Sequence, residues 1–201
     1  MSAPATVLIL YYSRKGRTQE LAREIALGVE GANALAVLRT VPPVSPDTAG
    51  TMPQVPTDGP PYVELDELVA CDALILGSPT RFGNMASALK YFIDSTSSLW
   101  LNGALAGKPA GVFTTGSSLH GGQESTLLSM ALPLIHHGMI YVGVPFTESR
   151  LFETQTGGSP YGATRITADW SEGFSDDERA IARALGHRVA SIATRLKPSD
   201  S

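Results

Sequence analysis

One stretch near the amino terminus constrains the fold more than any other part of the sequence. It reads Val7-Leu8-Ile9-Leu10-Tyr11-Tyr12-Ser13-Arg14-Lys15-Gly16-Arg17-Thr18, an apolar run followed by a polar loop and then a helical pattern. A near-continuous apolar run is typical of a parallel strand buried on both faces. The loop then joins the carboxyl end of a strand to the amino end of a helix, where backbone N–H groups and the helix dipole attract an anion. The stretch therefore predicts a phosphate site.

Buried strands and helical patterns alternate along the rest of the chain. After the strand that begins at Val7, strands are expected at 34–38, 72–77, 109–114 and 139–144. Helices are expected at 17–29, 64–70, from Ala86 onward, and at 123–137, where Pro133 should kink the helix or remove a hydrogen bond. This alternation predicts an α/β fold: a flavodoxin-like three-layer sandwich with a five-stranded parallel sheet in the order 2-1-3-4-5 and helices on both faces.

Two segments lack a regular pattern, and the chain ends in a helix. Residues 41–62 hold seven of the fourteen prolines, which excludes regular structure there, and 145–173 shows no strong period. Ser175 and Glu178 form a capping box that opens the last helix. Its expected inward-facing residues are Ile181, Ala182, Leu185, Val189, Ile192 and Leu196. At 201 residues, the chain is expected to be a single domain, 1–201.

Composition excludes several classes of function. The net charge is −4 and no long run carries a single sign, which argues against a nucleic-acid partner and against a membrane-surface helix. No apolar run is long enough for stable membrane insertion and no signal peptide is evident, so we expect a cytoplasmic protein. The single cysteine, Cys71, excludes an internal disulfide and a cysteine-based metal site, and its place before a buried strand predicts an inert core thiol.

The first loop lacks the glycine patterns of two common phosphate sites. Neither G-x-x-x-x-G-K-[ST] nor G-x-G-x-x-G occurs there, so a nucleoside-triphosphate loop and a dinucleotide-binding turn are both disfavoured. Ser13, Gly16 and Thr18, together with backbone N–H groups, suit a terminal monophosphate. The alternative is an ordinary turn that caps a helix.

Two further loops follow the third and fourth strands, so all three loops meet at one edge of the sheet. Residues 79–84 carry Arg81 and Phe82 and suit a flat heterocycle, or else form a surface turn with a helix cap at Asn84. Residues 115–122 are rich in glycine and hydroxyls and suit close approach of a ligand, or else form a flexible connector. His136 and His137 end a helix, where a favourable interaction with the helix dipole explains a histidine as well as a catalytic role does. On the sequence alone, Trp100 is better explained as a packing residue than as a catalytic one.

Six motifs in order along the chain resemble the WrbA-type NAD(P)H:quinone oxidoreductases, which are flavodoxin-like proteins that bind FMN. They are Tyr11-Tyr12-Ser13 with Gly16; Pro79-Thr80-Arg81-Phe82-Gly83-Asn84-Met85; Leu99-Trp100 with Gly103-Ala104-Leu105 and Gly107-Lys108; Gly121-Gly122-Gln123-Glu124; His136-His137-Gly138-Met139; and Pro160-Tyr161-Gly162-Ala163-Thr164.

The resemblance implies an FMN site built from the three loops, and a homotetramer. In this reading His136 reaches the ring region and assists the quinone oxygen, while Trp100 and Lys15 bind substrate, Trp100 from across a subunit boundary. The cofactor-binding residues it implies are Ser13, Arg14, Lys15, Gly16, Arg17 and Thr18 for the phosphate; Pro79, Thr80, Arg81, Phe82, Gly83 and Asn84 along the isoalloxazine; and Thr115, Gly116, Ser117, Ser118, Leu119 and Gly121, with His136, around the rest.

The implied reaction is hydride transfer from NADH or NADPH to FMN and then two-electron reduction of a quinone substrate, by a ping-pong mechanism. This sequence departs from the family at Lys15, where the family often has an aromatic residue, and in the loop after the fourth strand, which is one residue longer. Two other functions stay open on the residues alone. One is a flavodoxin-type electron carrier without its own NAD(P)H turnover, and the other is a regulatory protein without turnover.

Overall fold

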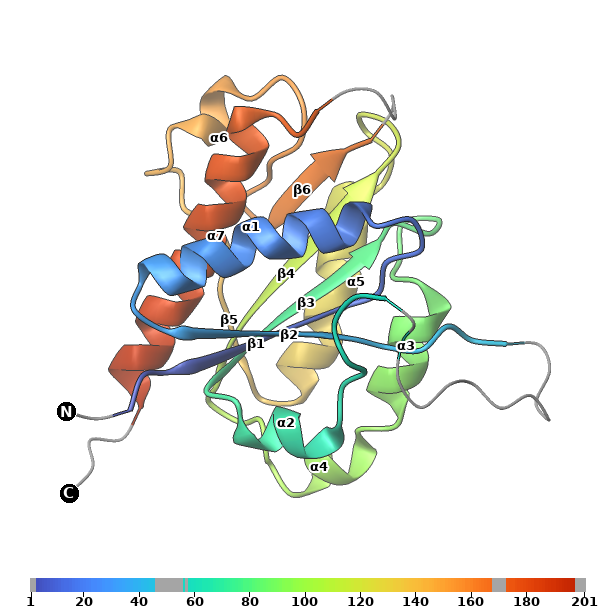
Figure 1. Cartoon of the computed structure of the whole chain (residues 1–201), viewed down its shortest axis with the longest axis vertical. Helices are drawn as coiled ribbons and strands as arrows, with labels where there is room; N and C mark the ends of the chain where they lie inside the picture. The colour runs from blue at the N-terminus through green and yellow to red at the C-terminus, as the bar shows by residue number, and fades with distance from the viewer. Residues whose placement is uncertain (1–2, 46–55, 57, 168–172, 198–201) are drawn as a thin grey trace.

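The computed structural model describes residues 3–45, 56, 58–167 and 173–197 (Figure 1). Its sheet is parallel throughout and follows the order β2-β1-β3-β4-β5, with β6 paired to β4, so the expected strand order is confirmed. The strands are β1 (Thr6–Tyr11), β2 (Leu35–Thr40), β3 (Ala73–Pro79), β4 (Pro109–Gly116), β5 (Ile140–Tyr141) and β6 (Ala163–Ile166).

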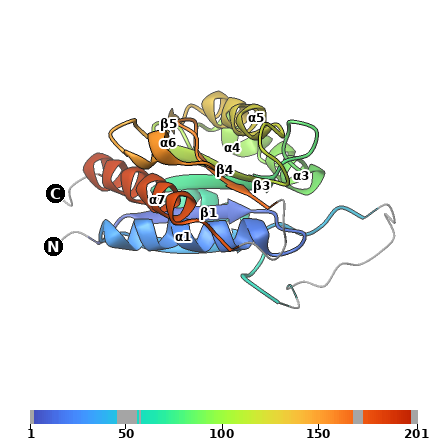
Figure 2. The same cartoon turned by 90° about the horizontal axis from the view of Figure 1, so that it is seen from above.

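Helices cover both faces of this sheet, which gives three layers (Figure 2). On one face lie α1 (Arg17–Gly31) and α7 (Asp176–Leu196), and on the other lie α3 (Ser87–Asp94), α4 (Ser97–Leu101) and α5 (Gln123–His136). The shorter helices are α2 (Leu65–Ala70) and α6 (Arg150–Glu153). The flavodoxin-like sandwich predicted from the alternation of strands and helices is therefore the observed fold.

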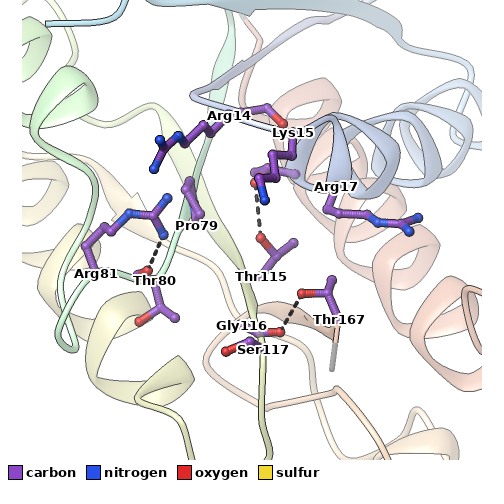
Figure 3. Close-up of a pocket in the computed structure, with 12 residues that line it drawn as sticks. Arg14, Lys15, Arg17, Pro79, Thr80, Arg81, Thr115, Gly116, Ser117 and Thr167 are labelled. Carbon is purple, nitrogen blue, oxygen red and sulfur yellow. Dashed lines mark hydrogen bonds between the residues drawn. The ribbon is translucent and has the colours of Figure 1, made fainter. Parts of the chain in front are cut away.

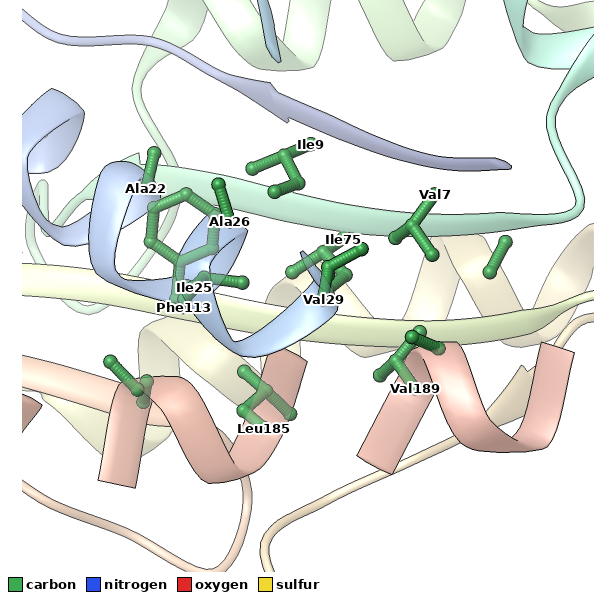
Figure 4. Close-up of a cluster of buried hydrophobic side chains, with 14 of the residues drawn as sticks. Val7, Ile9, Ala22, Ile25, Ala26, Val29, Ile75, Phe113, Leu185 and Val189 are labelled. Atoms are coloured by element: carbon green, nitrogen blue, oxygen red, sulfur yellow. The ribbon is translucent and has the colours of Figure 1, made fainter. Parts of the chain in front are cut away.

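The two faces of the sheet support two separate cores, because neighbouring side chains of a strand point to opposite sides. Along β1, Val7 and Ile9 pack against α1 and α7 (Figure 4), whereas Leu8 and Leu10 pack on the opposite side with residues of α3 and α5. All four side chains are at most 1% exposed. This burial on both faces explains why the strand is apolar at every position.

Helices α1 and α7 approach closely because glycines face the contact. A Cβ added at Gly28 would overlap the carbonyl of Arg183, and one added at Gly186 would overlap the carbonyl of Ile25. Figure 1 shows the two helices crossing on this face, with α1 beginning directly after the loop that follows β1.

The segment 145–173, expected to be irregular, instead contains α6 and β6, so that prediction is wrong. The expected fifth strand, 139–144, is also shortened to Ile140–Tyr141. Beyond it the chain leaves the sheet at Gly143, where the backbone of Pro160 packs too closely for a side chain. The edge of β4 is thus shared: β5 pairs with Pro109 and Ala110, and β6 pairs with 113–116.

The capping box of α7 is confirmed, since the Glu178 N–H donates to Ser175 Oγ at 3.1 Å and the Ser175 N–H donates to the Glu178 carboxylate. Leu196 was expected to face inward but is half exposed at the last turn, so that assignment is wrong. Helix α5 continues past Pro133 to His136. Within the Pro-rich region, 46–55 and 57 lie outside the described residues. None of the described helices has the length and apolar character needed to cross a bilayer.

Candidate active site

A hollow of about 260 Å³ lies at the carboxyl edge of the sheet, where the loops after β1, β3 and β4 meet (Figure 3). This is the edge at which α/β sheets of this order bind ligands. The lining residues are Ser13, Arg14, Lys15, Arg17, Thr18, Pro79, Thr80, Arg81, Thr115, Gly116, Ser117 and Thr167. The structure therefore brings the three loops singled out in the sequence into one cavity.

The loop after β1 is shaped to accept an anion. Gly16 precedes α1 with φ 84°, a left-handed conformation that glycine adopts without strain, and no side chain caps the amides of the first turn from that position. The dipole of α1 adds positive potential at the same place. Thr18 is buried, and its Oγ1 lies 3.1 Å from Thr115 Oγ1, which ties this loop to the end of β4. The arrangement suits a phosphate monoester.

The loop after β3 is a tight hairpin that holds one aromatic ring in solvent. Arg81 and Asn84 exchange backbone hydrogen bonds of 2.8 and 3.0 Å, and the two residues between them, Phe82 and Gly83, both have positive φ. A bulky residue rarely adopts this conformation, and such strain is concentrated at ligand sites. The Phe82 ring is fully exposed beside the hollow.

The end of β4 and the first turns of α5, which flank the loop after β4, are hydrogen-bonded to Thr80 of the hairpin. The Thr80 N–H donates to the Thr115 carbonyl at 2.9 Å, and Thr80 Oγ1 lies 2.7 Å from Thr126 Oγ1 on α5. Gly122, with φ 89°, precedes α5. The remaining residues implied by the resemblance lie in these three loops without lining the hollow itself: Gly16, Phe82, Gly83, Asn84, Ser118, Leu119 and Gly121.

One lining residue, Thr167, was missed by the sequence analysis. It follows β6, and both its N–H and its hydroxyl donate to the Gly116 carbonyl, at 2.7 and 3.0 Å. A lone threonine in a segment without a periodic pattern offers no local signal. Only the pairing of β6 with β4 places Thr167 at the site.

An ion pair with a buried arginine and a partly exposed carboxylate lies behind the first loop. Arg165 on β6, 2% exposed, pairs with Glu20 in the first turn of α1, and Glu20 also pairs with Arg17 at 3.2 Å. Partial burial raises the pKa of Glu20, but the hydrogen bonds and charges of Arg165 and Arg17 outweigh it and hold that pKa below its usual value. The carboxylate is thereby neutralised next to the proposed anion site.

The lining of the hollow is strongly cationic. Among the described residues that line it, twelve in all, four are basic and none is acidic; the basic ones are Arg14, Lys15, Arg17 and Arg81. The whole chain, in contrast, carries 15 basic and 19 acidic residues. Positive potential in a concave site favours a negatively charged ligand and raises its rate of binding.

His136 and Trp100 lie in a different hollow from the three loops. They line a second cavity of about 370 Å³ between α3, α4 and the carboxyl end of α5. Because the amino end of α5 adjoins the loop after β4, the 14-residue helix sets His136 roughly 20 Å from the first hollow. Trp100 is half exposed and His136 is exposed, so neither is a core packing residue.

The neighbouring His137 has a structural role. It is buried, and its Nε2 lies 2.9 Å from Thr96 Oγ1. Since the Thr96 hydroxyl donates its proton to the Ile93 carbonyl at 2.7 Å, His137 Nε2 must be the donor to Thr96. Burial and the charge of His136 lower the pKa of His137, so its ring is neutral at pH 7. The Cys71 thiol is likewise buried, and burial raises its pKa to about 11, as expected of an inert core thiol.

Comparison with known proteins agrees with this geometry. The model of the family described as NADPH-dependent FMN reductase matches residues 6–149. The chain belongs to this family. It is 46% identical over 200 residues to a protein of Geobacter sulfurreducens named NAD(P)H dehydrogenase (quinone), with 94% of this chain and 98% of the relative covered. A protein of Gluconacetobacter diazotrophicus with the same name is 45% identical over 195 residues, with the same coverage.

Solved structures extend the similarity to the fold as a whole. A flavodoxin, WrbA-like protein from Agrobacterium tumefaciens superimposes with a TM-score of 0.70 at 25% identity, covering 96% of this chain and 99% of the other. An archaeal flavodoxin superimposes with a TM-score of 0.62 at 20% identity, covering 94% of this chain and 98% of the other. The resemblance to WrbA-type oxidoreductases seen in the sequence motifs is thus confirmed.

Proposed function

We propose that this member of the family is an FMN-dependent NAD(P)H:quinone oxidoreductase. The observation that carries the proposal is the cationic hollow at the carboxyl edge of the sheet, with the left-handed Gly16 at the start of α1 at one side and the Phe82 hairpin at the other. The names of the two curated relatives support the reaction.

The donor set of the hollow fits FMN. The hydroxyls of Ser13 and Thr18 and the first-turn amides of α1 would hold the phosphate, while Pro79 and the hairpin would line the ring. Bound FMN would supply the two-electron chemistry that carries a hydride from NADH or NADPH to a quinone. Because the two substrates would use the same open side of the ring in turn, we expect ping-pong kinetics.

We assign His136 and Trp100 to the substrate pocket of a neighbouring subunit in a homotetramer. Within one chain α5 separates them from the FMN site by its full length, so they would have to reach a ring held by another copy. The exposed face of α5 carries Leu128, Leu132 and Ile135, an apolar stripe that supports an assembly through this face. There His136 would donate a hydrogen bond or a proton to the quinone oxygen. We also propose that the whole chain is one domain and that it acts in the cytoplasm.

The test is reconstitution. Purified protein is mixed with FMN, binding is followed by the loss of flavin fluorescence, and NADH or NADPH oxidation is followed with and without benzoquinone. We expect bound FMN and quinone-dependent oxidation of at least one nucleotide, and His136→Ala should slow quinone reduction. Bound FMN with neither nucleotide oxidised would favour an electron carrier instead, and unchanged quinone turnover in His136→Ala would remove that residue from the mechanism.

A further inference from the structure

The candidate active site carries more positive charge than one phosphate monoester can neutralise. A phosphate monoester has about two negative charges at pH 7, whereas the described residues that line the hollow include four basic side chains and no acidic one. Of these four, Arg17 already pairs with Glu20. Two of the remaining cations, Arg14 and Arg81, supply positive charge at the rim of the hollow.

The loop after β1 offers the phosphate of FMN donors other than these arginines. The first-turn amides of α1 beside the left-handed Gly16 and the hydroxyls of Ser13 and Thr18 form a cradle of donors for phosphate oxygens, in which Ser13 Oγ also accepts from the Gln19 N–H at 3.4 Å. The positive end of the α1 dipole adds to it. In such a cradle, backbone groups can bind the phosphate without help from the rim.

Arg14 and Arg81 come from different loops but reach the same part of the rim. Arg14 follows β1 and Arg81 follows β3, and in Figure 3 both guanidinium groups extend toward the space beside Pro79, whereas Arg17 points away from it. Both residues are exposed. Arg81 donates to the Thr80 carbonyl at 2.7 Å, which steadies its side chain.

Neither guanidinium has a carboxylate partner within the described part of the chain. Two like charges that face one region repel each other modestly in water, and an anion between them turns that repulsion into attraction. Planar guanidinium groups suit phosphate oxygens, to which each can donate two parallel hydrogen bonds.

We propose that Arg14 and Arg81 form a second anion subsite, which binds a phosphoryl group of the nicotinamide dinucleotide at the rim of the flavin site. The inference rests on the proposed function, because it assigns the subsite to the electron donor. Two phosphoryl groups share this chemistry: the 2′-phosphate, which only NADPH has, and the diphosphate bridge of both nucleotides.

The test compares Arg14→Gln, Arg81→Gln and the double variant with the wild type, all loaded with FMN. Each single variant should lower kcat/KM about tenfold, the usual effect of losing one charged hydrogen bond to phosphate. A loss confined to NADPH identifies the 2′-phosphate, and an equal loss for NADPH and NADH identifies the diphosphate. The fall of kcat/KM with added salt should also be shallower in the variants.

A binding measurement provides a readout apart from turnover. Calorimetric titration of the FMN-loaded protein with adenosine 2′,5′-bisphosphate, ADP and AMP should show tighter binding of one of the first two than of AMP, lost in the double variant. Arg188→Gln, an exposed arginine on α7 that is remote from the hollow, is the matched control and should change neither readout.

Two results would overturn the inference. One is unchanged nucleotide kinetics and binding in the double variant. The other is a parallel loss of FMN affinity, measured by flavin fluorescence, because the arginines would then hold the FMN phosphate itself. If wild-type protein with bound FMN oxidises neither nucleotide, the proposed function fails, and the calorimetric titration still decides whether the rim binds a phosphoryl group.

Discussion

At the scale of single residues, packing against a neighbour on the next strand decides which residue type a core position can hold. Gly77 on β3 is an example, since the Phe113 ring of β4 occupies the space where a Cβ would lie. Phe113 is fully buried between the sheet and α1 (Figure 4). Its position depends on the absence of a side chain on the adjacent strand, so the pair acts as one packing unit.

Gly77→Ala should therefore destabilise the protein by about 1–3 kcal/mol, the usual cost of adding a methyl group to a packed core. Urea unfolding followed by circular dichroism measures the loss. Gly31→Ala is the control, because a Cβ at this position in the last turn of α1 meets nothing within 4 Å; it should leave stability unchanged or raise it by up to about 1 kcal/mol. Adding Phe113→Leu should recover part of the loss, and equal destabilisation by both glycine variants would contradict the explanation.

At the scale of elements, β6 is the piece that completes the site, and Glu178 attaches it to α7. The Glu178 carboxylate, 2% exposed, accepts from the N–H groups of Gly157 and Ile166 at 2.9 Å each and from Ser175 at the start of α7. One side chain thus caps a helix and holds the segment that leads to Arg165 and Thr167.

Glu178→Ala should cost about 3 kcal/mol of unfolding free energy, because it removes the acceptor of the buried Gly157 N–H and of the partly buried N–H groups of Ile166 and Ser175. Hydrogen exchange should speed up most at the amides of Gly157 and Ile166, while the amides of β1 and β3 stay protected. Glu178→Gln keeps one acceptor oxygen and should lose less. Glu30→Ala, at an exposed carboxylate on α1, is the control and should stay close to wild type. Uniform acceleration over all strands would mean that β6 has no separate stability.

At the scale of the whole molecule, the two hollows lie at opposite ends of α5. The first hollow is lined by residues of the three loops, and the second is lined by Trp100 and His136 among others. A single copy therefore keeps the proposed flavin site and the proposed proton donor apart. In a closed assembly of identical chains, the second hollow of one copy can face the first hollow of another.

Mixing two defective variants tests this arrangement. One carries Ser13→Ala with Thr18→Val and lacks the phosphate cradle, and the other carries His136→Ala. If each site uses loops from one subunit and His136 from the next, random mixing should restore full activity at about a quarter of the sites. Turnover after refolding the mixture measures this, with each variant refolded alone as the control and light scattering reporting the assembly. Activity no greater than the average of the two variants would contradict the shared site.

The sequence by itself determined the sheet order, the place of the loop between β1 and α1, the α7 capping box and the meeting of three loops at one edge. These follow from signals within a few residues: apolar runs, turn formers and hydroxyls spaced along the chain. The predictions of strand order and loop position were confirmed because five strands and their helices can bury their apolar residues in only a few arrangements.

Only the tertiary structure decided the rest of the site. The four residues of β6 include Thr164 and Arg165, so no apolar period marks a strand, and pairing with β4 is what orders them. That pairing brings Thr167 to the hollow and Arg165 to Glu20, 145 positions away in the chain. The separation of His136 from the loops likewise depends on the direction and length of α5. Ion pairs and strand pairing join residues that are far apart in the chain, so a local sequence pattern does not predict them.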